Sequence, residues 1–198
     1  MKRGIKEMNI ILASGSPRRK ELLAQAGFDF EVEVSNADEN VAEESPTEMV
    51  VELAARKAEA VVNLHNKKED NCLVIGADTI VVLDGKILGK PADEADAKAM
   101  LASLSGRTHQ VYTGVALFSL KEGIIEKKTT FHECTDVTMV PMTEKEIADY
   151  VASGDSMDKA GAYGIQGMAA IFISEIKGDY YNVVGLPISR VYHEIEQF

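Results

Sequence analysis

Apolar and polar positions recur along this chain with two periods, and each period predicts one kind of element. Short apolar runs, and stretches in which every second residue is apolar, are typical of buried and half-buried strands. Such strands are predicted at residues 10–12, 28–34, 72–76, 80–83, 86–88, 108–120, 124–139, 169–175 and 180–184. Asp84-Gly85 suits a tight turn, which makes the fourth and fifth of them a hairpin.

Helix signals lie between these strands. Ser16 as an N-cap and Pro17 at the first helical position predict a helix that runs to Gly27. Further helices are predicted from the capping box Ser45-Pro46-Thr47-Glu48 to about Leu64, over residues 93–104, from Thr143 to near Gly154, and after Pro187. Residues 35–44 and 158–167 are expected to be loops. The mixture predicts an α/β fold with substantial antiparallel pairing.

The second predicted helix carries a lysine on its apolar side. Lys57 falls within a stripe at helical spacing that consists of Val50, Leu53, Ala54, Val61 and Leu64. An ammonium group on the inward side must extend to solvent, form an ion pair or serve a site. The stripe alone leaves these alternatives open.

Cations gather at the start of the first predicted helix, where backbone N–H groups lack partners and the helix dipole is already positive. Arg18 and Arg19 occupy this first turn. A bound phosphate would resolve the conflict, because it would meet N–H groups, the hydroxyl of Ser14 and the arginine side chains, with Gly15 allowing a close approach. The alternative is a surface helix whose cations face water.

Length, composition and charge limit the classes of protein. A chain of 198 residues with 45% apolar content can bury one core or two small lobes. The 32 acidic and 21 basic residues give a net charge of -11, which disfavours nucleic acid and anionic membranes as partners. The apolar run from Ile10 to Ala13 is too short for a signal peptide or a membrane span, which indicates a cytoplasmic protein. Cys72 and Cys134 are expected to be buried free thiols.

Several common catalytic motifs are absent from the sequence. The four histidines stand alone, so no HExxH zinc site is indicated, and no serine lies in a GxSxG motif. The stretch Gly85–Lys90 lacks the spacing of a phosphate-binding loop, and Pro91 stands where such a loop requires Ser or Thr. Histidine-bound zinc and a serine nucleophile of the α/β-hydrolase type are therefore disfavoured.

Carboxylates and cations at the ends of predicted elements remain as candidates for chemistry. They are Arg18, Arg19, Glu39, Lys57, Asp78 and Lys90. Hydrolysis of a phosphoanhydride needs such a mixture, because carboxylates hold Mg²⁺ and cations offset charge on phosphate oxygens. Asp78 is expected just after a buried strand, where it could orient or deprotonate water. Taken separately, Asp78-Thr79 could instead cap a turn, and Asp38-Glu39 could belong to a solvated loop.

Six blocks of the sequence, in order, resemble the signature motifs of the Maf family of nucleoside triphosphate pyrophosphatases. They are residues 14–23, 76–79, 89–91, 104–106, 158–167 and 184–187. The resemblance extends from about Asn9 to the C-terminus. It implies one domain over residues 1–198, with a mixed twisted sheet, helices on both sides and an elongated two-lobed Maf/ITPase-like architecture around a central cleft. It also implies a homodimer.

The resemblance implies hydrolysis between the α- and β-phosphates with a divalent cation, Mg²⁺, Mn²⁺ or Co²⁺. The positions that match catalytic residues are Asp78 as proton acceptor, Glu39 as its partner in holding the metal, and Lys57 and Lys90 as phosphate contacts, while Ser14 and Arg19 would hold phosphate oxygens. The block around Glu39 departs from the commoner patterns of the family. Asp38 is therefore an alternative for that role.

Base choice is expected to depend on three further positions. Arg18, Thr79 and Gln166 match residues of the subgroup that acts on dTTP and UTP. Physically, a Gln amide offers a donor and an acceptor, which fits the O4 and N3–H edge of uracil or thymine. We expect dTTP and UTP as substrates, together with modified pyrimidine triphosphates. The alternatives are a 7-methyl-GTP pyrophosphatase, a non-catalytic nucleotide-binding regulator of septum formation, and a phosphatase that releases orthophosphate stepwise.

Overall fold

The computed structural model describes residues 9–39, 45–65 and 71–198, so part of the loop expected at 35–44 lies outside the described residues. The chain forms two compact units. Unit 1 consists of Met1–Asp78, Thr113–Glu133 and Gly185–Phe198, and unit 2 of Thr79–Tyr112 and Cys134–Val184. The expectation of a single domain with a central cleft stays a prediction.

The described residues contain one mixed sheet of seven strands, in the order β2-β1-β3-β5-β6-β7, with β4 paired to β3. The strands are β1 (Ile10–Leu12), β2 (Phe30–Val32), β3 (Cys72–Leu83), β4 (Lys86–Leu88), β5 (Thr108–Lys121), β6 (Ile124–Met139) and β7 (Ile173–Lys177). β1 runs parallel to β2 and β3, whereas β4 and β7 pair antiparallel with their neighbours. The mixed α/β fold is thus confirmed.

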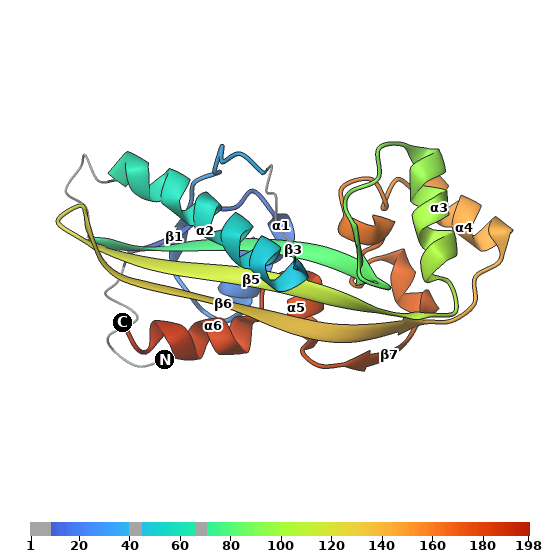
Figure 1. The fold of residues 1–198 in the computed structure, drawn as a ribbon. Helices are drawn as coiled ribbons and strands as arrows, with labels where there is room; N and C mark the ends of the chain where they lie inside the picture. Colours follow the sequence, from blue (N-terminus) through green and yellow to red (C-terminus); the bar gives the residue numbers. More distant parts are fainter. Residues whose placement is uncertain (1–8, 40–44, 66–70) are drawn as a thin grey trace. The chain divides into compact units, whose positions relative to one another are not determined.

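In unit 1, β1 and the adjoining parts of β3 and β5 are buried on both faces of the sheet. Helix α2 (Pro46–His65) runs across β3 and β5 (Figure 1), so closely that a Cβ atom at Gly76 or Gly114 would collide with its backbone. On the other face, Ile10 and Ile75 are fully buried. Helices α1 (Pro17–Gln25) and α6 (Ile188–Ile195) complete the unit. None of the described helices is long and apolar enough to cross a membrane.

The apolar stripe of α2 is confirmed except at its end. Val50, Leu53, Ala54 and Val61 are buried, but Leu64 is 56% exposed. The prediction for Leu64 is wrong because the last turn buries His65 instead, whose Nε2 lies 3.1 Å from a carboxylate oxygen of Glu33. At the other end the Ser45 hydroxyl accepts a hydrogen bond from the Glu48 N–H, which confirms the predicted cap.

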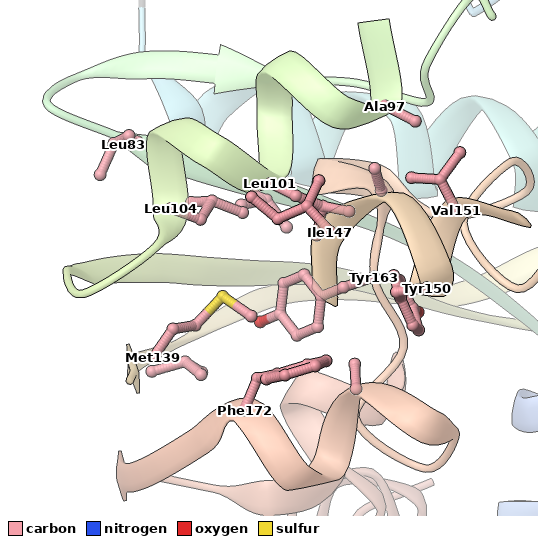
Figure 2. Packing of buried hydrophobic residues seen from close by; sticks show 14 of the residues in the cluster. Leu83, Ala97, Leu101, Leu104, Met139, Ile147, Tyr150, Val151, Tyr163 and Phe172 are labelled. Atoms are coloured by element: carbon pink, nitrogen blue, oxygen red, sulfur yellow. The ribbon is translucent and has the colours of Figure 1, made fainter. Parts of the chain in front are cut away.

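Unit 2 has its own core, built from its helices and the strand segments that it contains. The helices are α3 (Glu94–Leu104), α4 (Glu144–Ala152), α5 (Tyr180–Val184) and the 3₁₀ segments η3 (Ala160–Ala162) and η4 (Met168–Phe172). Figure 2 shows Leu101 and Leu104 of α3 beside Ile147 of α4, with Tyr163 and Phe172 below them. The cap predicted for α4 is present at Thr143, whereas Asp93, predicted as the first residue of α3, is its N-cap and accepts a hydrogen bond from the Asp96 N–H.

Two strands predicted near the C-terminus are wrong in whole or in part. Residues 169–172 belong to η4, and only 173–177 form a strand. The stretch from Tyr180 to Val184 is helix α5, because Asp179 caps it by accepting a hydrogen bond from the Tyr181 N–H. The buried Asn182 amide donates to Val111 O and Thr135 Oγ1 at 2.9 Å each. An interior hydrogen-bonded amide gives no periodic signal in the sequence.

The two cysteines differ from each other. Cys72 in β3 is buried, as predicted, whereas Cys134 in β6 is exposed, and neither forms a disulfide. The prediction of burial is therefore wrong for Cys134, which occupies an outward position of its strand.

A buried histidine makes the stability of unit 2 depend on pH. Nε2 of His109 lies 2.7 Å from the Tyr163 hydroxyl, and burial, opposed by the Asp136 charge, lowers the pKa of His109 to about 4. Between pH 6.5 and 4 the unfolded chain therefore binds a proton that the folded chain does not, so stability falls as pH falls. We expect His109 to account for a loss of about 2 kcal/mol in the free energy of unfolding between pH 7.5 and pH 5.

Urea unfolding at the two pH values checks this prediction. His109→Gln should remove most of that difference, whereas His132→Gln, at an exposed position of β6, should keep it. Equal pH dependence in the wild type and His109→Gln would contradict the prediction.

Candidate active site

Polar side chains of unit 1 lie beyond the carboxyl ends of neighbouring parallel strands. Ser14 and helix α1 follow β1, and Glu39 follows β2 in the chain. The pairing of β1 with β3 ends at Leu12 and Ile75, three residues before Asp78. Because ligands of α/β sheets bind beside the carboxyl ends of parallel strands, these residues occupy a suitable place for a site.

Asp78 lies within a strand, not after one. The prediction that the strand ends near Gly76 is wrong, because β3 continues to Leu83. Its pairing with β1 nevertheless stops before Asp78, so the carboxylate has no β1 side chain beside it. Side chains alternate along a strand, and Val74 belongs to the core cluster that includes Ala54 and Ala58 of α2. Asp78 therefore shares the α2 face of β3, while Thr79 points to the opposite face.

Lys57 joins the two predicted carboxylates. Its Nζ lies 2.5 Å from Asp78 Oδ1 and 2.9 Å from Glu39 Oε1. The side chains of Lys57 and Asp78 are each 15% exposed and that of Glu39 is 65% exposed. Of the three roles open to an inward lysine, the structure therefore shows an ion pair. It is Glu39 whose carboxylate reaches Lys57, whereas the main-chain oxygen of Asp38 accepts a hydrogen bond from Arg56.

Arg19, in the first turn of α1, is buried. Its Nε donates to the main-chain oxygen of Gly185 at 2.8 Å, and its Nη1 donates to Ser14 Oγ at 3.0 Å. Burial lowers the pKa of Arg19, while the charges of Asp78 and Glu39 act in the opposite direction. Arg19 thus places a positive charge beside the two carboxylates and fixes the Ser14 hydroxyl. Direct contact of Arg19 with phosphate stays a prediction.

The start of α1 differs in detail from its predicted cap. Ser16 has the extended backbone of an N-cap but makes no capping hydrogen bond with its side chain. Its N–H instead donates to Ser14 Oγ at 3.3 Å. Arg18 in the first turn is half-buried, and its charge contributes to the lowered pKa of Arg19. The turn therefore concentrates positive charge at a helix N-terminus, as an anion site requires.

The remaining predicted residues belong to unit 2. Lys90 is exposed, and its neighbour Gly89 accepts a hydrogen bond from the Gly161 N–H at 3.0 Å. This bond joins the Lys90 segment to the loop that contains Gln166, which is also exposed. Unit 1 therefore brings together Ser14, Arg18, Arg19, Glu39, Lys57 and Asp78, whereas Thr79, Lys90 and Gln166 belong to unit 2.

The two carboxylates suit a hard divalent cation. Glu39 and Asp78 supply oxygen ligands that converge on one ammonium group, and Mg²⁺ is usually held by one or two carboxylates together with substrate phosphates. Within residues 9–39, 45–65 and 71–198, no group of three or more His, Cys, Asp or Glu side chains is arranged to hold a metal ion. The donor set thus fits a cation shared with a phosphorylated ligand.

The fold and these residues define an α/β protein with a site suited to a phosphorylated ligand. A family described as Maf-like protein matches residues 9–198. The chain belongs to this family.

Curated relatives are similar to the chain over almost its whole length. It is 55% identical over 190 residues to a dTTP/UTP pyrophosphatase of Bacillus mycoides, covering 96% of this chain and 95% of that protein. It is 52% identical over 198 residues to a dTTP/UTP pyrophosphatase of Bacillus cereus, covering 100% of this chain and 93% of that protein. A solved HAM1 protein from Coxiella burnetii is 15% identical, with a TM-score of 0.49 and coverage of 96% and 100%.

Proposed function

We propose that this protein hydrolyses dTTP and UTP between the α- and β-phosphates and releases the nucleoside monophosphate and pyrophosphate. The ion pair of Lys57 with Asp78 and Glu39 is the observation that carries the proposal, because two carboxylates and a cation meet just beyond the point where the parallel pairing of β1 with β3 ends. The substrate class is supported by sequence identities of 55% and 52% to proteins named dTTP/UTP pyrophosphatase.

A divalent cation, Mg²⁺, Mn²⁺ or Co²⁺, is part of this proposal, with Glu39 and Asp78 as the residues that hold it. Such a cation polarises phosphate oxygens and offsets the charge that develops on them. The carboxylate chemistry of the two residues supports this choice. Asp38 stays the alternative to Glu39, although it is the Glu39 carboxylate that lies 2.9 Å from Lys57 Nζ.

Each residue of unit 1 has a role that its position supports. Asp78 accepts a proton from the attacking water, since its carboxylate is mostly buried beside a cation. Lys57 offsets negative charge on the phosphates. Ser14 binds a phosphate oxygen together with the N–H groups at the start of α1, and Arg19 keeps the Ser14 hydroxyl in place.

Residues of unit 2 complete the proposed substrate contacts. Lys90 is an exposed ammonium group that binds phosphate, and the Gln166 amide pairs with the O4 and N3–H edge of the pyrimidine. Thr79 and the half-buried Arg18 are proposed as further substrate contacts. The proposal includes a cytoplasmic homodimer that acts on free nucleotides. The net charge of -11 supports the choice of free nucleotides over nucleic acid or membranes.

The test is product analysis with a panel of nucleotides and metals. The purified protein is incubated with each common nucleoside triphosphate and with 7-methyl-GTP, in Mg²⁺, Mn²⁺ or Co²⁺, and the phosphate product is identified. We expect pyrophosphate, released fastest from dTTP and UTP. Faster turnover of 7-methyl-GTP would overturn the substrate choice, orthophosphate would indicate a phosphatase, and tight binding without release would indicate a regulator.

A further inference from the structure

Gln166 lies at the tip of a short hydrogen-bonded turn in unit 2. The turn consists of Gly164, Ile165, Gln166 and Gly167, and the Gly167 N–H donates to the Gly164 carbonyl at 3.0 Å. Ile165 is buried, with 8% of its surface exposed, whereas Gln166 is exposed. The turn therefore holds Gln166 outward on an anchored backbone.

An ion pair lies directly against this turn. Lys159 Nζ donates to the main-chain oxygen of Asp155 at 2.7 Å, to Asp155 Oδ1 at 2.9 Å and to Asp158 Oδ1 at 2.7 Å. These three acceptors match the three donors of an ammonium group. The Lys159 side chain is only 12% exposed, so the pair is held in one arrangement and is little screened by water.

Both ends of the turn touch this pair. A Cβ atom at Gly164 would lie 2.5 Å from Lys159 Cε, and one at Gly167 would overlap Asp155 Oδ2. The Gly164 N–H donates to the Tyr150 hydroxyl at 3.3 Å, and that hydroxyl donates to Asp155 Oδ2 at 3.1 Å. Tyr150 itself is buried in the core of unit 2 (Figure 2). The backbone on either side of Gln166 is thus fixed by one network that ends in helix α4.

We propose that the Asp155–Lys159 ion pair supports the Gly164–Gly167 turn and fixes Gln166 in the orientation that recognises a pyrimidine base. The inference rests on the proposed function, because it assigns Gln166 to base recognition. Asp155 and Lys159 are positioning residues in this arrangement. They act on base selectivity through the turn and leave the chemistry at Asp78 unchanged.

The kinetic test compares UTP with CTP, whose amino group and unprotonated N3 mismatch an amide set for uracil. Asp155→Asn keeps the shape of the side chain but removes its charge. We expect kcat/KM for UTP to fall about tenfold, mainly through a higher KM, and the UTP-to-CTP preference to fall with it. Asp155→Glu should restore most of the preference. Asp149→Asn, which breaks an exposed ion pair on α4, should match the wild type.

A double-mutant cycle isolates the action through Gln166. In a Gln166→Ala background, Asp155→Asn should no longer change the UTP-to-CTP preference. A further selectivity loss of the same size in that background would overturn the inference, as would an unchanged preference in Asp155→Asn itself. A wild type that releases pyrophosphate without preferring UTP to CTP would also overturn it, while the pyrophosphatase proposal would stand.

Amide hydrogen exchange tests, without any reliance on activity, whether the ion pair stabilises the turn. We expect the Gly164 and Gly167 amides to exchange about tenfold faster in Asp155→Asn, with the amides of β1 unchanged. Equal exchange in the wild type and the variant would overturn the positioning role even if the enzyme is a pyrophosphatase. Faster exchange in a protein that releases no pyrophosphate would support the role of the ion pair in stabilising the turn and would refute the proposed function.

Discussion

The Asp78→Asn variant is expected to lose about 1,000-fold in the rate of pyrophosphate release from UTP while keeping its fold. Asparagine has the size of aspartate but neither accepts a proton from water nor holds a divalent cation through a charged oxygen. The fold should persist because Lys57 keeps its contact with Glu39 at 2.9 Å. Steady-state rates with a saturating divalent cation give the loss, and thermal unfolding checks the fold.

A carboxylate in the turn that follows β3 provides the matched control. Asp84 follows the strand at the turn to β4, where both of its side-chain oxygens bind Arg107 Nη2 at 2.7 and 2.6 Å in an exposed position. Asp84→Asn should therefore keep the wild-type rate. A full rate in Asp78→Asn would remove Asp78 from the chemistry, and equal losses in both variants would mean that the effect is not specific to the site.

Elements with strong local signals were predictable from the sequence. Helices α3 and α4 have capping side chains, and the turn between β3 and β4 has positive φ angles at Asp84 and Gly85, as its residue types require. Predictions failed where long-range pairing decides the structure. Gly76 ends an apolar run in the sequence, yet it allows α2 to approach β3, which continues beyond it.

The candidate site was predictable as a set of residues but not as a set of contacts. An inward Lys57 could be inferred from helical spacing, because it depends on one element alone. Its two acidic partners lie on other elements, so their convergence needed the fold. Arg19 binds the main-chain oxygen of a residue 166 positions away, and a main-chain acceptor has no side-chain signature.

The contact of the Asp155–Lys159 pair with the Gly164–Gly167 turn could not be predicted from the sequence either. Their spacing of four residues is that of an ordinary helical ion pair. Only the structure shows that two glycines of the following loop lie against it. The sequence does contain a signal, since Gly164 and Gly167 flank Gln166, but close approach and flexibility are both satisfied by glycine. The fold decides between them in favour of close approach.

Replacement of Lys57 by methionine is the second change with a large expected effect. Methionine keeps an unbranched side chain at this position of α2 but removes the ammonium group between Asp78 and Glu39. Two carboxylates that shared one cation are then left facing each other, and the phosphates lose a positive charge in a mostly buried position. We expect pyrophosphate release to fall about 100-fold.

Two further lysine variants decide what Lys57 contributes. Lys128→Met removes the partner of Glu59, another residue of α2, from an exposed ion pair and should leave the rate unchanged. Lys57→Arg keeps the charge but spreads it over a planar group, so an intermediate rate is expected if charge is what matters. If Lys57→Arg is as slow as Lys57→Met, placement of the compact ammonium between the two carboxylates, and not its charge alone, limits the reaction. A wild-type rate in Lys57→Met would refute any role of Lys57 in hydrolysis, because no neutral side chain can replace a cation that holds Asp78 and offsets phosphate charge.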